Sequence, residues 1–192
     1  MELMTAVETR RSIRRFKSDP LPRETVVEIL NAARLAPSGK NMQPWRFVAV
    51  QGDALKEMGA CLDRALEHRA AEGVRPGSAA NTFRIMKEAP VTVFVLSRRD
   101  SFHPKERPIP DYVMSLVDAQ SVGGAIEHML LRATELNVGS LWIADTFFAY
   151  EELCAWLGTD ALLLAAVTLG YADEAPEARP RRALGKMVEW RE

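Results

Sequence analysis

The sequence is poor in the residues that mark metal-binding, disulfide-rich and nucleic-acid-binding proteins. It has two cysteines and three histidines in 192 residues, too few and too dispersed for a disulfide framework or a metal site. Cys61 and Cys154 each lie among helix-like apolar neighbours, so we expect two buried thiols. Lys and Arg number 25 against 26 Asp and Glu, a net charge of -1, and we therefore expect no sequence-independent nucleic-acid binding.

Long hydrophobic runs are also missing. The apolar stretches have the length of a strand and fall well short of the roughly 20 residues that cross a bilayer. Residues 1–5 carry neither the charged leader nor the apolar core of a secretory signal. We expect a cytoplasmic protein without membrane contact. Hydrophobic residues make up 47% of the chain, enough for one core, and we expect one domain over residues 1–192.

What is present is an alternation of helical and extended patterns. Apolar residues at helical spacing predict helices over 4–9, 23–36, 55–70, 111–137 and 150–157. Apolar and β-branched runs predict strands over 45–50, 91–96, 139–143 and 162–169. Proline and glycine predict irregular segments over 73–78 and 101–110 and an extended tail from 171 onward. Together these patterns predict helices and strands that alternate around one mixed sheet.

The longest predicted helix, over 111–137, would extend about 40 Å. Its middle is small and apolar, with Gly123, Gly124 and Ala125 in succession. A helix with so little polar surface must be covered on most sides. A helix-mediated homodimer would supply that cover, and the alternative is an ordinary core helix of a monomer.

Residues 10–16 read R-R-S-I-R-R-F and concentrate four guanidinium groups around Ser12. In a chain of nearly balanced charge, this is a local set of phosphate-binding donors and not a generally basic surface. The segment predicts a docking site for an anion. Seen alone, however, such a cluster is more often solvated surface, and a partner-binding or nucleic-acid-binding patch is a further alternative.

Residues 36–45 read A-P-S-G-K-N-M-Q-P-W. Pro37 closes the preceding helix, and Ser38 and the following glycine form a turn. The amide side chains of Asn41 and Gln43 can then donate to and accept from a planar polar ligand. Alone, this is an ordinary loop composition.

In order and spacing these two motifs, with G-S-L-W-I at 139–143 and R-P-R-R at 179–182, resemble the nitroreductase family of flavin enzymes. The resemblance implies an α+β fold with a mixed sheet flanked by helices. It also implies an intertwined homodimer whose C-terminal tail extends onto the partner. One FMN per subunit would lie at the dimer interface, with NADH or NADPH as electron donor.

The resemblance also implies the residues that would hold FMN. Arg10 and Ser12 would grip the phosphate together with Arg181 or Arg182, and Arg14 would lie beside the pyrimidine edge of the ring and tune its potential. The full set expected to bind the cofactor is Arg10, Arg11, Ser12, Arg14, Pro37, Ser38, Asn41, Gln43, Trp142, Ile143, Ala144, Arg181 and Arg182. No catalytic side chain and no metal ligand is expected, because the flavin carries the chemistry.

The implied function is an FMN-dependent NAD(P)H oxidoreductase that reduces an electron-poor acceptor, such as a nitroaromatic, quinone or enone, by a ping-pong mechanism. The segments 73–78 and 101–110 would gate the substrate. Two alternatives share the fold: an enzyme that consumes flavin or removes halogen reductively, and a flavin-binding protein without catalysis.

Overall fold

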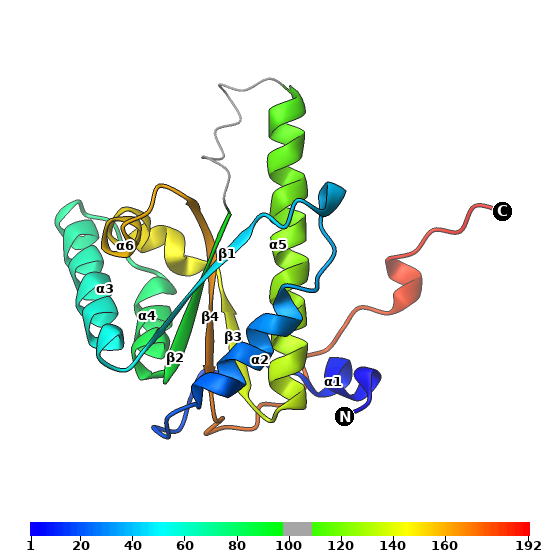
Figure 1. Ribbon diagram of the computed structural model, residues 1–192, viewed down its shortest axis with the longest axis horizontal. Coiled ribbons are helices and arrows are strands. Elements are labelled where there is room, and N and C mark those ends of the chain that lie inside the picture. The colour runs from blue at the N-terminus through cyan, green and yellow to red at the C-terminus, as the bar shows by residue number, and fades with distance from the viewer. Residues whose placement is uncertain (98–108) are drawn as a thin grey trace.

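The computed structural model describes residues 1–97 and 109–192. Its helices and strands, drawn in Figure 1, have the following bounds: α1 (Leu3–Thr9), α2 (Arg23–Ala33), β1 (Trp45–Gln51), α3 (Asp53–Ala71), α4 (Ala79–Glu88), β2 (Val91–Ser97), α5 (Ile109–Glu135), β3 (Gly139–Ile143), α6 (Tyr150–Leu157) and β4 (Leu162–Gly170). Short 3₁₀ turns lie at η1 (Gly39–Asn41), η2 (Asp145–Ala149) and η3 (Leu184–Lys186).

The four strands form one sheet in the order β1-β2-β4-β3, and each neighbouring pair is antiparallel. The α+β class is confirmed, but the prediction of a mixed sheet is wrong for these strands. The connection from β1 to β2 runs through α3 and α4, and that from β3 to β4 runs through η2 and α6. In both cases the chain returns antiparallel to the strand it left. Parallel pairing in the described residues is limited to an isolated bridge between Ser12 and Ser140.

Helices cover both faces of the sheet (Figure 1). On one face α2 and α5 pack against alternate residues of the inner strands, among them Val93 of β2 and Val167 of β4. On the other face α3, α4 and α6 pack against the intervening residues, among them Phe94 and Leu141. The two-residue period of the strands therefore separates two hydrophobic cores.

Helix α5 has 27 residues, a length of about 40 Å at 1.5 Å per residue. One side of it is buried in the core through Val122, Ala125 and Met129. Near its beginning Val113 and Leu116 are 46% and 37% exposed. One chain thus covers one side of α5 and leaves apolar residues exposed on another. A dimer through this helix stays a prediction.

Most predicted elements are confirmed with small shifts of their ends. Helix α2 stops at Ala33, three residues earlier than predicted, because the residue before Pro37 is biased away from helical geometry. Helix α4 was not predicted at all. The predicted irregular segment 101–110 lies outside the described residues, except that Ile109 and the proline after it begin α5.

Cys61 is buried and Cys154 half-buried, and both are free thiols. Burial raises the pKa of each thiol. In the part of the chain that the structure describes, no helix has the length and apolar character needed to traverse a bilayer. Residues 177–192 are exposed, and Figure 1 shows this tail leaving the body of the molecule beside α1.

Candidate functional site

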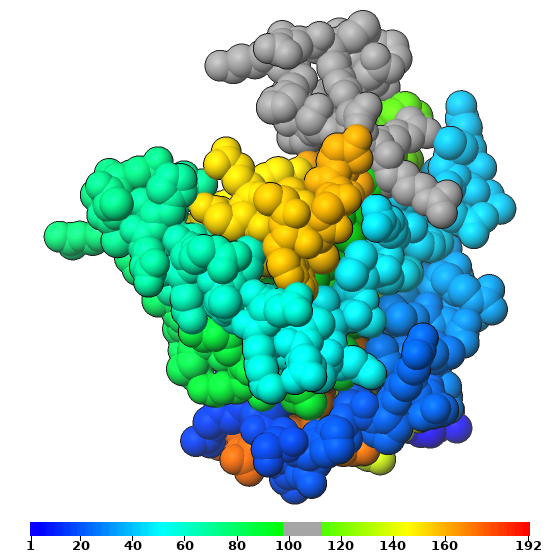
Figure 2. Space-filling view, turned by 60° about the vertical axis from the view of Figure 1, so that its left-hand side comes forward, coloured from blue at the N-terminus to red at the C-terminus, as the bar shows by residue number. Residues whose placement is uncertain are grey.

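The arginine-rich segment is fixed against the open edge of the sheet. Ile13 N–H donates to the carbonyl of Ser140 in β3 at 2.9 Å. Further on, Lys17 N–H donates to the carbonyl of Tyr171 at 2.8 Å, and Phe16 bridges to Ala172. Figure 2 shows this junction at the base of the molecule, where orange atoms of the segment after β4 lie against blue N-terminal atoms. The fold therefore holds the arginines between two backbone anchors.

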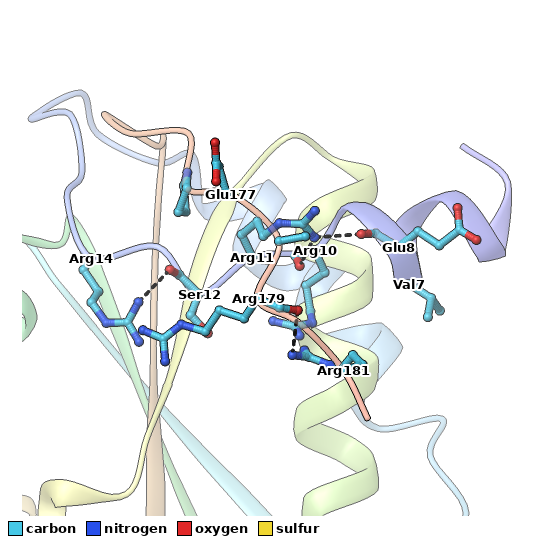
Figure 3. Close-up of a pocket in the computed structure, with 11 residues that line it drawn as sticks. Val7, Glu8, Arg10, Arg11, Ser12, Arg14, Glu177, Arg179 and Arg181 are labelled. Atoms are coloured by element: carbon cyan, nitrogen blue, oxygen red, sulfur yellow. Dashed lines mark hydrogen bonds between the residues drawn. The ribbon is translucent and has the colours of Figure 1, made fainter. Parts of the chain in front are cut away.

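A cavity of about 410 Å³ lies at this segment. It is bounded by the end of α1, the arginine-rich segment and the first part of the C-terminal tail (Figure 3). Five arginines and two glutamates line it, together with smaller residues: Val7, Glu8, Arg10, Arg11, Ser12, Arg14, Pro176, Glu177, Ala178, Arg179 and Arg181.

The guanidinium groups converge without matching carboxylates. Figure 3 shows Arg14 and Arg179 pointing toward one another, while the carboxyl ends of Glu8 and Glu177 point away from the arginines. Within residues 1–97 and 109–192, the one ion pair of a cavity arginine joins Arg10 Nε to Glu127 Oε1, at 3.9 Å. Like charges gathered in this way repel, and an anion with several acceptor oxygens would relieve the repulsion.

Arg11 has a different role from its neighbours. Its Nη1 donates to the carbonyls of Glu8 at 2.7 Å and Arg10 at 2.9 Å, so the guanidinium caps the carboxyl end of α1, where a cation is favoured. Its Nε is buried and has no hydrogen-bond partner. A buried orphan donor beside a cavity is a polar atom that a ligand oxygen can satisfy.

The second motif forms a turn with unusual backbone geometry. Lys40, Asn41 and Gln43 have φ angles of 51°, 55° and 45°, in the left-handed region that L-residues with a Cβ seldom adopt. Gln43 N–H donates to Ser38 Oγ at 3.0 Å, which helps to hold the turn. Asn41 and Gln43 are exposed, as is Pro37. Such geometry at exposed amide side chains is typical of a binding loop.

This turn is seated on α5. Gly39 N–H donates to Ser121 Oγ at 3.3 Å, and a Cβ added to Gly39 would lie 2.3 Å from Cγ1 of Val117. Only glycine permits this close approach. Ser121 and Glu127, the partner of Arg10, are six residues apart on the same helix, about 9 Å along its axis. One helix therefore carries both motifs.

The carboxyl end of β3 adds backbone groups to the same edge. The carbonyl of Ser140 faces the arginine segment, and because strand backbone groups alternate sides, those of Trp142 face the same way. The Trp142 side chain is 43% exposed, whereas Ile143 is 3% exposed and belongs to the core. By the same alternation the backbone groups of Ile143 face β4, where Ile143 pairs with Ala166, so Trp142 and the exposed Ala144 are the positions whose backbone a ligand can contact.

The structure thus brings some of the expected site residues together and separates others. Arg10, Arg11, Ser12, Arg14 and Arg181 line one cavity. Arg182 does not line it, and Gln43 lines a second, mostly apolar hollow of about 510 Å³ between α2 and β1.

One cavity arginine, Arg179, was not among the expected site residues. Its signal was in the sequence, because it begins the same R-P-R-R run that contains Arg181. The described residues hold no group of three or more His, Cys, Asp or Glu side chains suited to a metal ion.

Fold and cavity together define an α+β protein equipped to hold an anionic ligand at the edge of an antiparallel sheet. Comparison with known protein families identifies the family of this chain. Residues 7–171 match the model of the nitroreductase family, and the chain belongs to that family.

Three similar proteins illustrate the relationship. An NADH dehydrogenase of Thermus thermophilus is 29% identical, with 100% of this chain and 97% of the relative covered. An iodotyrosine deiodinase of Thermotoga neapolitana is 28% identical, with 93% of each chain covered. The crystal structure of a nitroreductase-type protein of Desulfovibrio desulfuricans in complex with FMN has a TM-score of 0.75 and 25% identity, and covers 100% of this chain and 98% of its own.

Proposed function

We propose that this chain is an FMN-dependent oxidoreductase that draws electrons from NADH or NADPH. The observation that carries the proposal is the convergence of Arg10, Arg14, Arg179 and Arg181 on one cavity whose lining glutamates, Glu8 and Glu177, point away from them. Family membership and the FMN in the Desulfovibrio structure support the choice of this cofactor over other phosphates.

The arginine cavity suits the phosphate end of FMN. A phosphate dianion accepts several charge-assisted hydrogen bonds, which contribute about 1.5–3 kcal/mol each. Arg10, Arg179 and Arg181 offer forked donors, and Ser12 offers a hydroxyl. The orphan Nε of Arg11 offers one more donor from within the protein. The donor set therefore fits the group.

Arg14 is proposed to act on the ring. Its Nη1 donates to the carbonyl of Ser12 at 3.1 Å, which keeps the guanidinium close to the backbone at the mouth of the cavity. Placed beside the pyrimidine edge of FMN, this fixed positive charge would stabilise the negative charge that develops there on reduction. Backbone groups of Trp142 and Ala144 would face the opposite part of the ring, whereas those of Ile143 pair with β4.

The ring end of the site is proposed to be completed by a second copy of the chain. Pro37, Ser38, Asn41 and Gln43 sit on a turn whose amide side chains face solvent in one subunit. Val113 and Leu116 of α5 are exposed apolar residues, and the tail leaves the body with Leu184, Met187 and Trp190 exposed by 60% or more. An intertwined homodimer with exchanged tails would cover these surfaces, with residues 1–192 forming one FMN-binding domain.

FMN held by these residues would supply hydride chemistry, with the reduced nicotinamide as the proposed electron donor and a second substrate as the acceptor in a separate half-reaction. The proposed acceptor is a small electron-poor molecule, such as a nitroaromatic, quinone or enone. The side chains of this chain would bind and orient the cofactor, and donor and acceptor are proposed to reach its ring end in turn, in a ping-pong sequence. The segment 73–78, an exposed loop between α3 and α4, is a proposed gate.

Colour and turnover test the proposal. We expect the purified protein to be yellow, to release FMN on denaturation, and to oxidise NADH or NADPH only when an acceptor is present. Arg14→Ala should retain FMN with weaker affinity and slow its reduction. A dimeric, folded sample that takes up no FMN when supplied in excess would overturn the proposal, as would a salt-sensitive affinity for polyanions in place of flavin.

The relationship to a deiodinase favours one second candidate, reductive removal of halogen from an aromatic substrate. Release of iodide from iodotyrosine by the dithionite-reduced protein would support this candidate. Turnover of nitroaromatics or quinones without iodide release would reject it.

A further inference from the structure

Glu174 lies just after β4 and makes contacts that bear directly on Arg14. Its Oε1 accepts hydrogen bonds from the backbone N–H of Arg14 and, at 3.2 Å, from that of Arg15. Its side chain is 18% exposed, against 67% for Arg15, whose Nε lies 3.5 Å from Glu174 Oε2. The ion pair with Arg15 is open to solvent and screened, so the two backbone contacts are the ones that fix the segment.

We propose that Glu174 is a positioning residue that fixes Arg14 at the cavity and ties it to the chain segment that carries Arg179. This inference rests on the proposed FMN function, since Arg14 acts on the ring only there. Two more hydrogen bonds hold the same two segments together: Asp173 N–H to the Arg15 carbonyl at 3.0 Å and Lys17 N–H to the Tyr171 carbonyl, which together form the antiparallel bridge between Phe16 and Ala172.

The Glu174 carboxylate also determines which hydrogen-bond donors remain available to an anion. Two successive backbone N–H groups form a small concave donor pair that binds anions in many proteins. Here Glu174 occupies that pair from within the chain, so an incoming phosphate meets arginine side chains and not the backbone of Arg14. Five residues beyond Glu174, the same segment supplies Arg179 to the cavity.

The direction of the flavin potential distinguishes positioning from simple charge. Removing a carboxylate near the ring would by Coulomb interaction alone make the potential more positive. Releasing Arg14 from its place would withdraw a positive charge and make the potential more negative. The two explanations therefore predict opposite signs for Glu174→Ala.

The experiment compares Glu174→Ala, Glu174→Gln and a matched control, Asp173→Asn, which removes one charge from the neighbouring position and keeps the backbone contact of Asp173. For Glu174→Ala we expect FMN affinity, measured by fluorescence quenching, to fall about tenfold, as the loss of one charge-assisted contact would cause, and the midpoint potential to become more negative. Glu174→Gln retains an acceptor oxygen and should restore most of the affinity. Asp173→Asn should leave the affinity unchanged and should not lower the potential.

Hydrogen exchange of the FMN-free protein supplies a readout that does not depend on the cofactor. The amides of Arg14 and Arg15 should exchange faster in Glu174→Ala than in the wild type, with the rest of β3 and β4 unchanged. Unchanged exchange, or a potential that becomes more positive in Glu174→Ala, would overturn the inference while leaving the FMN proposal intact.

Failure of the wild type to bind FMN would instead overturn the proposed function, and the exchange measurement would still test the contact itself. Should Glu174→Ala not fold, Glu174→Asp replaces it. Its shorter side chain is expected to reach only one of the two N–H groups and to give the same changes at smaller size. Wild-type affinity and exchange in that variant would also refute the role.

Discussion

The two motifs seated along α5 differ in how completely one subunit builds them. The arginine segment is anchored to β3 and to the chain after β4, and its side chains meet at a cavity. The 37–43 turn is fixed to α5 at Gly39, yet its polar side chains face solvent and three of its residues have positive φ. The charged end of the site is therefore formed within one chain, whereas the turn holds its shape while its amide side chains remain in solvent.

The largest effect is expected when an arginine is removed from the charged end of the site. Arg10→Ala removes a forked donor from the cavity, and we expect FMN to bind about 1.5–3 kcal/mol more weakly, which corresponds to roughly 10- to 150-fold. Equilibrium titration of the FMN-free protein measures this change. Arg84→Ala, on α4 and paired with Glu88, removes the same charge elsewhere and should bind FMN as the wild type does. Equal affinities in both variants would contradict the role of Arg10.

The second prediction breaks the seat of the turn. Gly39→Ala places a methyl group where Val117 already lies, and overpacking of this kind costs about 1–3 kcal/mol. We expect a lower midpoint in urea unfolding and weaker FMN binding. The double variant Gly39→Ala, Val117→Ala makes room for the methyl group and should recover part of the loss. Gly185→Ala, in the exposed tail with open space around it, is the control, and equal unfolding midpoints for all three would refute the packing argument.

The third prediction concerns the backbone strain of the turn at Lys40, which a glycine would relieve. A residue with a Cβ in the left-handed region costs about 1–2 kcal/mol, and glycine gives back about 0.5–1 kcal/mol through the freedom of the unfolded chain. Lys40→Gly should therefore stabilise the protein slightly, by about 0.5 kcal/mol. Lys40→Ala keeps the Cβ and should show no gain. Urea unfolding of the two variants side by side would expose an error in this reasoning if alanine stabilised as much as glycine.

The smallest expected effect is on the stability of the folded protein at low pH. A hydrogen bond from Arg132, near the end of α5, lowers the pKa of Glu135 from 4.5, and Glu135 also lies 3.6 Å from the amino group of Met1. Because this pKa is lower in the folded state, the stabilisation is present above the unfolded pKa and is lost as pH falls through the folded value. Melting temperatures of wild type and Glu135→Gln should differ slightly at neutral pH and converge in acid.

Sequence patterns predicted the elements better than their arrangement. Unbroken apolar runs such as that of β2 are reliable because a strand buried on both faces needs apolar residues throughout. Helix α4 was missed because it is short and begins with small and polar residues, although Ala79, Phe83 and Met86 lie at helical spacing and are buried. Strand direction could not be predicted in the same way, because the apolar pattern of a buried strand is the same in parallel and antiparallel pairs and the direction depends on the path of the connecting chain.

The residues of the candidate site could likewise be predicted only in part. The arginine cluster and the R-P-R-R run could be found from composition, since guanidinium groups in a balanced chain are conspicuous. The left-handed turn could not, because Lys40 and Gln43 are residues that rarely adopt such angles. Its geometry depends on Gly39 meeting Val117, a contact between residues 78 positions apart. Nor could spacing show that Arg182 lies outside the cavity that Arg179 and Arg181 line.

The exposed tail gives the chain a weak point for proteolysis. Residues 177–180 are accessible, and glutamate-specific proteases cut after exposed glutamate side chains such as that of Glu177. One cleavage after Glu177 would detach Arg179 and Arg181 together, leaving three of the five guanidinium groups in place. A protein cleaved in this way would keep its sheet and both hydrophobic cores but would bind a phosphate more weakly. Loss of the prosthetic group on storage would therefore indicate cleavage of the tail before any secondary structure is lost.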